Sequence, residues 1–244
     1  MVFPIDGRNH HSGGRAETDT VKVLNESVPP YISSIYGSDI TFVHRGGTKT
    51  VADIDIVKND EVLDAISVKN HQSGTYDYIN TSAVKGYFDD ADVKAALKKI
   101  KDEVKTVSEA RPLVTRTLQD KLMSLDSSQI KKIMETCTLR APKWMLIRAS
   151  GKMHFFPHSN IDAFHIKDGD TFVLRQTRAK GSAKIWRVRD HLETDTTLRL
   201  RYVLNNGVTA LLGQSAKNTG SIPTIKIQQD AVRTLLSAVK AVIL

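Results

Sequence analysis

The chain has 244 residues and a mass of 27.1 kDa, which is enough for one large domain or two small ones. Hydrophobic residues make up 40% of it and charged residues 25%, which excludes a wholly disordered or collagen-like chain. Lys and Arg number 35 against 27 Asp and Glu, giving a net charge of +8. Residues 143–244 hold 16 of these basic side chains and only 7 of the acidic ones. The excess favours a polyanionic partner for the C-terminal part of the chain.

Features of the cellular environment can also be read from the sequence. The single cysteine, Cys137, excludes an internal disulfide and a Cys-based zinc site, and it is typical of a reducing compartment. No apolar run approaches the roughly 18 residues that suggest a membrane span. Residues 1–14 have neither the basic nor the apolar segment of a signal peptide. We therefore expect a cytoplasmic protein with no membrane partner.

The first third of the chain predicts a helix followed by strands. Apolar residues spaced three and four apart predict a helix over residues 17–28, which Pro29 and Pro30 then end. Three strand-like runs follow, the last two joined by a polar turn as in a hairpin: residues 40–44, 51–57 and 62–68.

The rest of the chain predicts helices and then a β-rich, basic part. Helices are expected over residues 90–110 and 128–136, the second capped by Ser127 or Ser128. Short alternating runs predict several strands between residues 144 and 202, then a strand at 225–227 and a helix over 230–242. We expect an α/β fold with a mixed central sheet flanked by helices. The division is expected near residue 140, into 1–140 and 141–244, as two domains or as one elaborated domain.

Polar side chains share one face of the predicted hairpin. Because side chains alternate along a strand, Asp53 and Asp55 lie on one side of the first strand. Ser67 and Lys69 share a face of the second strand in the same way. Glu17 heads the apolar stripe of the first helix, from which it can reach this patch. The alternatives are a surface hairpin with a cross-strand ion pair and, for Glu17, a helix N-terminal acid favoured by the helix dipole.

These residues, in this order, resemble the PD-(D/E)XK nuclease superfamily, which includes many restriction endonucleases and Holliday-junction resolvases. The resemblance covers roughly residues 14–85 and rests on a Gly-x-Ala-Glu-like helix opening at 14–17, an Ala-Asp strand and a hairpin strand that ends in x-x-Lys. The family's first acid falls on Asp53, its lysine on Lys69 and its helix acid on Glu17. Ser67 stands where the family usually has Asp or Glu. The resemblance implies a restriction-endonuclease-like core.

The same resemblance implies a Mg²⁺- or Mn²⁺-dependent endonuclease that hydrolyses DNA, as a homodimer if both strands are cut. Lys69 would orient or deprotonate the attacking water, or stabilise the charged transition state. Ser67 can offer only a neutral oxygen or a water-mediated contact. The metal would be held by hard oxygen ligands: Asp53 with Glu17, Asp55 or the main-chain carbonyl of Val68.

Six basic residues lie within residues 175–189, around a Gly-Ser turn and beside Trp186. A β-ribbon of this kind can lie along phosphates or enter a groove, and the alternative is a set of solvated strands. Strand alternation places Lys184 and Trp186 on one face, with Arg187 and Arg189 on the other. The predicted nucleic-acid contacts are Gln72, Arg175, Arg178, Lys180, Lys184, Arg187 and Arg189.

Two other classes of function stay open at this stage. The first is a non-catalytic nucleic-acid-binding protein on a nuclease-like scaffold, which the serine at position 67 would explain. The second is an interaction protein whose basic face meets an acidic protein partner.

Overall fold

A computed structural model describes most of the chain: residues 11–45, 52–71, 76–79, 91–178, 181–204, 207–214, 223–229 and 232–244. These residues form two compact units, each made of separate stretches of the chain. The first unit consists of residues 1–76, 140–162 and 231–244, and the second of residues 77–139 and 163–230. The chain thus returns to the first unit at residue 140, near the predicted boundary. Residues 141–244 do not form one unit, because the two strands that follow residue 140 belong to the sheet of the first unit.

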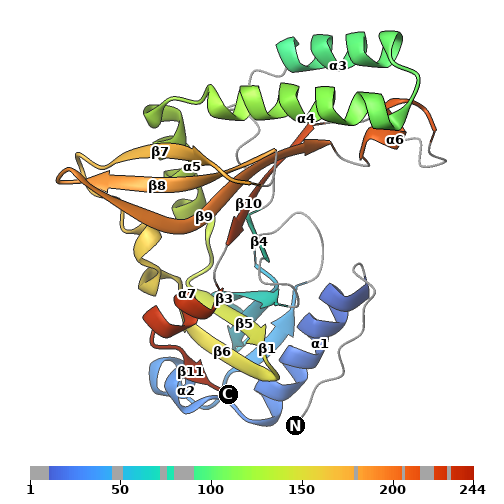
Figure 1. The fold of residues 1–244 in the computed structure, drawn as a ribbon. Helices are drawn as coiled ribbons and strands as arrows, with labels where there is room; N and C mark the ends of the chain where they lie inside the picture. Colours follow the sequence, from blue (N-terminus) through green and yellow to red (C-terminus); the bar gives the residue numbers. More distant parts are fainter. Residues whose placement is uncertain are drawn as a thin grey trace. The chain divides into compact units, whose positions relative to one another are not determined.

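The first unit is built on a six-stranded sheet in the order β1-β2-β3-β5-β6-β11 (Figure 1). β3 and β5 run parallel, while the other neighbouring strands run antiparallel. The α/β class and the mixed sheet are therefore confirmed. The strands are Thr41–His44 (β1), Ile54–Lys58 (β2), Glu61–Asn70 (β3), Trp144–Ala149 (β5), Lys152–Pro157 (β6) and Val242–Ile243 (β11).

Helix α1 (His11–Glu26) packs against this sheet through its apolar stripe. Leu24 is fully buried beside Phe42 and Ile54 of the sheet. Asn25 fixes the contact, because its side chain donates to the carbonyl of Phe42 and accepts from the same residue's N–H, both over 2.8 Å. The other helices of the unit are α2 (Pro30–Tyr36), the 3₁₀ turn η3 (His158–Asn160) and α7 (Val232–Ala238).

The second unit contains a five-stranded sheet in the order β4-β10-β9-β8-β7. Helix α4 contacts β8 and β9 and buries Val114, Leu118 and Leu122 (Figure 1). The strands are Tyr76–Ile79 (β4), Thr171–Gln176 (β7), Ser182–Arg189 (β8), Leu192–Leu204 (β9) and Pro223–Gln229 (β10). The helices are Ala91–Glu103 (α3), Val107–Met123 (α4), Ser127–Arg140 (α5) and Gly207–Leu211 (α6), with a 3₁₀ turn at Asp162–Phe164 (η4) where the chain crosses between the units.

The predicted hairpin is confirmed as β2 and β3. Its turn residues Asn59 and Asp60 have φ values of 50° and 64°, as a two-residue turn with both central residues in the left-handed region requires. The first helix and the strand at 40–44 are also confirmed. Pro30, however, begins α2 instead of only ending the preceding helix, because proline fits the first position of a helix.

The helix predicted over residues 90–110 is wrong as a single element. Thr106 adopts an extended conformation and accepts a hydrogen bond from the N–H of Glu109, which starts α4 as a separate helix. The cap of α5 is also corrected: the N–H of Gln129 donates to Asp126, and neither Ser127 nor Ser128 takes this role. The predicted C-terminal helix ends earlier, at Ala238. The predicted first residues of three elements, Val51, Asp90 and Asp230, lie outside the described ranges.

No helix in the described parts of the chain is long and apolar enough to cross a membrane.

Candidate active site

Strand ends converge on one edge of the six-stranded sheet. β2 runs antiparallel to β1 and β3, so its beginning lies beside their ends, and β5 ends at the same edge because it is parallel to β3. The residues brought to this edge are His44 at the end of β1, Asp53 directly before β2, Asn70 at the end of β3 and Arg148 near the end of β5. Residues far apart in the sequence thus lie at one edge of the sheet, where the strand pairing ends.

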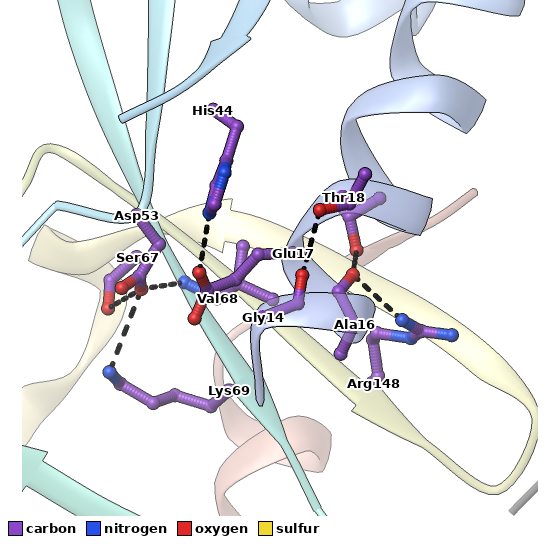
Figure 2. Close-up of polar contacts among 11 residues, drawn as sticks. Gly14, Ala16, Glu17, Thr18, His44, Asp53, Ser67, Val68, Lys69 and Arg148 are labelled. Carbon is purple, nitrogen blue, oxygen red and sulfur yellow. Dashed lines mark hydrogen bonds and ion pairs between the residues drawn. The ribbon is translucent and has the colours of Figure 1, made fainter. Parts of the chain in front are cut away.

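Asp53 has three partners on β3 (Figure 2). Its Oδ2 accepts a hydrogen bond from the N–H of Val68 over 2.6 Å and one from the hydroxyl of Ser67 over 3.1 Å. The ammonium of Lys69 forms an ion pair with the same oxygen at 3.9 Å. The structure therefore brings Asp53, Ser67 and Lys69 together, as the hairpin pattern predicted.

The backbone explains why the Asp53 side chain lies there. Its N–H donates to the carbonyl of Ile66 over 3.0 Å, which is a contact of the ladder between the strands. Two residues further along β3, the N–H of Val68 points to the same side, and the carboxylate of Asp53 satisfies it in place of a main-chain carbonyl. The carbonyl of Val68 faces that side too, since both backbone groups of a residue in an antiparallel ladder point to one neighbour. This carbonyl is thus turned toward Asp53.

Ser67 and Lys69 share one face of β3 but differ in exposure. Ser67 is buried at 2% exposure, whereas the side chain of Lys69 is 18% exposed. The side chain of Asp53 is 21% exposed. A half-buried ion pair of this kind is reachable by water and small ions, while the hydroxyl of Ser67 lies beneath it.

Glu17 forms a hydrogen bond with His44, a residue that the sequence pattern did not indicate. The Nε2–H of His44, at the end of β1, donates to Oε2 of Glu17 over 2.7 Å (Figure 2). Among the described residues, Glu17 makes no contact with Asp53 or Lys69. The sequence predicted that Glu17 lies close to Asp53 and Lys69, but in this structure its hydrogen-bond partner is His44.

Asp55 has a different partner as well. Its carboxylate forms a two-point ion pair with the guanidinium of Arg45, with both nitrogen–oxygen distances at 2.9 Å. Asp55 is only 8% exposed. The pair engages a buried carboxylate, whose Oδ2 accepts a hydrogen bond while Oδ1 has the ion pair alone, and Asp53 is the acid that faces Lys69.

Arg148 adds a further positive charge to the edge. Its guanidinium donates to the carbonyl of Ala16 over 2.8 Å (Figure 2). It also lies 3.9 Å from the carboxylate of Asp19. Burial lowers the pKa of Arg148 from its usual range, and Asp19 opposes this shift. This arginine ties the end of β5 to the first turns of α1, the helix that carries Glu17.

The oxygen donors at this edge are suited to a hard cation. In the described parts of the chain, no group of three or more His, Cys, Asp and Glu side chains is arranged to hold a metal ion. Asp53 offers one carboxylate, which already accepts from the Ser67 hydroxyl and the Val68 N–H, and strand geometry places the carbonyl of Val68 on the same side of β3. Mg²⁺ is commonly held by one or two carboxylates and completed by waters and substrate phosphates, so this donor set fits it in that manner.

The predicted nucleic-acid contacts lie in several environments. Arg178 is exposed at the end of β7, and Arg175 and Lys184 are partly exposed on neighbouring strands. Arg187 is buried, at 6% exposure. Gln72 and Lys180 lie outside the described residues.

Arg189 is held by contacts within the second unit. Its guanidinium binds both oxygens of Asp170 at 2.7 Å and donates to the carbonyl of His165 over 2.6 Å. The hydrogen bonds from Arg189 lower the pKa of Asp170 to about 2. The arrangement is that of a structural ion pair, since these contacts join β8 to the segment from His165 to Asp170.

Comparison with protein-family models, curated proteins and solved structures finds no match for this chain.

Sequence reasoning missed His44, Arg45 and Arg148. A signal for the first two was present: a strand that ends in His-Arg and runs antiparallel to a strand preceded by Asp places these residues at one edge. Arg148 could not be found in this way, because its place depends on the parallel pairing of β3 with β5, which are separated by a long stretch of chain.

Proposed function

We propose that this protein is a Mg²⁺- or Mn²⁺-dependent endonuclease that hydrolyses phosphodiester bonds in DNA. The observation that carries the proposal is the meeting of Asp53, Ser67 and Lys69 at a sheet edge, with the Val68 backbone turned toward the same carboxylate. We further propose that the first unit has a restriction-endonuclease-like core. Its mixed sheet with α1 packed beside it supports this assignment.

The residues would act as follows. Asp53 and the carbonyl of Val68 would hold the cation, which when bound supplies positive charge to the phosphate and acidifies a water molecule. Lys69, beside Asp53, would orient the attacking water or stabilise the charge that develops on the phosphate. The hydroxyl of Ser67 holds Asp53 in place by donating to it.

Glu17 has an auxiliary role in this proposal. Its Oε2 is paired with His44, so Glu17 would join the ligands through its other oxygen or by leaving that hydrogen bond. Asp55 stays with Arg45 and supports the strand next to the site. The chain therefore offers one carboxylate directly, and the substrate phosphate is expected to strengthen binding of the cation.

The proposal is tested by incubating the purified protein with supercoiled plasmid and Mg²⁺ or Mn²⁺, beside EDTA controls. Nicking is expected with metal only, and it is expected to vanish in Asp53→Ala while DNA binding is retained. The Asp53→Asn variant serves as a matched control for folding, because the amide can still accept the hydrogen bond from Val68. Full nicking activity in Asp53→Ala would overturn the site assignment.

A second function is favoured by a specific observation. Two of the acids near the site, Glu17 and Asp55, are already paired with basic side chains, and position 67 carries a serine. This arrangement suits a non-catalytic nucleic-acid-binding protein on the same scaffold. Titration of Mn²⁺ into the protein in the presence of duplex DNA discriminates the two, since only the nuclease requires a metal at Asp53.

Cutting both strands of a duplex requires two active sites, because one site cleaves one strand. We therefore include a homodimer in the proposal. Sedimentation of the protein with and without duplex DNA tests for the homodimer. If the protein stays monomeric under both conditions, the proposed activity is restricted to nicking one strand.

A further inference from the structure

The sheet of the second unit has two chemically different faces. Along β9, Leu198, Leu200 and Tyr202 are at most 1% exposed, and they alternate with the half-buried Arg199 and Arg201. Ile185 of β8 is likewise fully buried, and α4 contacts both strands. The apolar face therefore belongs to the core of the unit, and the charged face is the opposite one.

Three cationic side chains form a row across this charged face. Arg175 of β7 is paired in register with Lys184 of β8, and Lys184 is paired with Arg199 of β9. Because neighbouring strands lie about 5 Å apart, the row spans about 10 Å at the backbone. Arg201 follows two residues after Arg199 and extends it along β9. We call Arg175, Lys184 and Arg199 the cationic row.

Two carboxylates lie on the same face and hold part of the row. Arg175 forms an ion pair with Glu193, and the ammonium of Lys184 lies 2.6 Å from the carboxylate of Asp195. The guanidinium of Arg175 also lies over the ring of Trp186, 5.4 Å from its centroid. With Arg201, the described residues of β7, β8 and β9 place four cations and two carboxylates on this face, an excess of positive charge among them.

We infer that the cationic row is the surface on which this protein binds the sugar-phosphate backbone of duplex DNA. The charge complementarity of the face carries the inference, which rests on the proposed function for the choice of DNA as the partner. Arg187 and Arg189 are excluded from the surface, because Arg187 is buried and Arg189 is bound to Asp170. A phosphate would replace the carboxylates as the partner of Arg175 and Lys184, without a change in the strands.

The test compares two triple variants with the same loss of charge. Arg175→Gln/Lys184→Gln/Arg199→Gln removes the row, and Lys94→Gln/Lys98→Gln/Lys101→Gln removes three exposed cations from α3. Binding to a fluorescent 30-base-pair duplex is measured by anisotropy between about 50 and 200 mM salt. The row variant is expected to bind at least about tenfold more weakly, with a log–log salt slope smaller by about 2 to 3. The α3 variant is expected to change affinity less than about twofold.

Equal weakening by both triple variants, or no weakening by the row variant, would overturn the inference. Folding is checked by circular dichroism, and Arg175→Lys/Arg199→Lys keeps the charges and is expected to bind as the wild type does. If the row variant loses binding to an acidic protein while its DNA binding is unchanged, the row is a surface for acidic proteins and the inference is overturned.

The experiment also separates this inference from the proposed function. If the row determines DNA binding and no metal-dependent nicking is found, the surface stands and the nuclease proposal fails. If nicking by the row variant matches the wild type at every protein concentration, the nuclease proposal stands and the surface assignment fails.

Discussion

The two sheets carry their charged side chains in different ways. In the first unit, Asp53 and Lys69 form an ion pair at the sheet edge, where β2 begins and β3 ends. In the second unit, the cationic row runs from the edge strand β7 across β8 to β9, on directly paired positions. The sheet edge places an acidic and a basic side chain within 4 Å of each other. The cationic row places like charges on neighbouring strands, which lie about 5 Å apart.

The sheet edge around Asp53 and the cationic row are therefore suited to different tasks. Groups that cooperate in chemistry must converge on one atom, and a sheet edge permits this because backbone groups there are no longer tied to a neighbour. Attraction of a polyanion needs only charges at intervals along a surface, which an ordered sheet face provides. Variants at the sheet edge are therefore expected to change the rate of nicking, and variants in the cationic row are expected to change the affinity for DNA.

After the complete loss of nicking expected for Asp53→Ala, the largest effect is expected at the same sheet edge, in Lys69→Ala. Removal of the ammonium beside Asp53 is expected to lower the single-turnover nicking rate by about 10²- to 10³-fold, the range found when one charge-stabilising group is removed. Affinity for duplex DNA should change less than about threefold. Nicking at more than a tenth of the wild-type rate would show that Lys69 has no direct role.

A smaller effect is expected from the ion pair between Asp170 and Arg189. Because the folded-state pKa of Asp170 is lowered from 3.8 to about 2, the pair stabilises the protein above pH 4, and this stabilisation is lost as the pH falls through about 2. Urea unfolding should show that Asp170→Asn lowers stability by about 1 to 2 kcal/mol at pH 7, allowing for solvent screening. The difference between the two proteins should shrink below pH 3, and a constant difference would contradict the assignment.

The cap of α4 provides a change in stability that should leave both functions intact. In Thr106→Ala the N–H of Glu109 loses its acceptor, and the free energy of unfolding is expected to fall by about 1 kcal/mol. Neither nicking nor DNA binding should change at 25 °C. A loss of either in a protein that is still folded would show that the two regions are not independent of this helix.

The smallest effect is expected from the carboxylates beside the cationic row. Glu193→Gln/Asp195→Asn removes the negative charges that compete with phosphate for Arg175 and Lys184. Affinity for duplex DNA in the anisotropy assay is expected to rise about threefold, as for weak surface ion pairs. Weaker binding would mean that these carboxylates are needed to hold the row in place.

Local patterns in the sequence predicted much of the fold. The hairpin of β2 and β3 was predicted because its apolar residues alternate around a short polar turn. The break at Thr106 was not, since the apolar spacing continues through Val104 and Val107 while the backbone turns out of the helix. The division into units was also missed in part, because the return of the chain at β5 depends on pairing with β3 across a long separation in sequence.

The candidate site was predicted to a similar extent. Asp53, Ser67 and Lys69 lie on adjacent strands of one hairpin, so their meeting follows from local register. The pairing of Glu17 with His44 does not follow from local register, because it depends on how α1 packs against β1. The spacing of residues in the helix does not indicate whether Glu17 pairs with His44 or with Asp53.

The most direct test of the account is the single-turnover rate of plasmid nicking with Mg²⁺, measured at increasing protein concentration. It is applied to the wild type, Asp53→Asn and Arg175→Gln/Lys184→Gln/Arg199→Gln. We expect that the row variant needs more protein but reaches the wild-type rate at saturation, whereas Asp53→Asn stays at the EDTA background at every concentration. Nicking by Asp53→Asn at the wild-type rate would contradict the central claim that the sheet edge around Asp53 performs the hydrolysis.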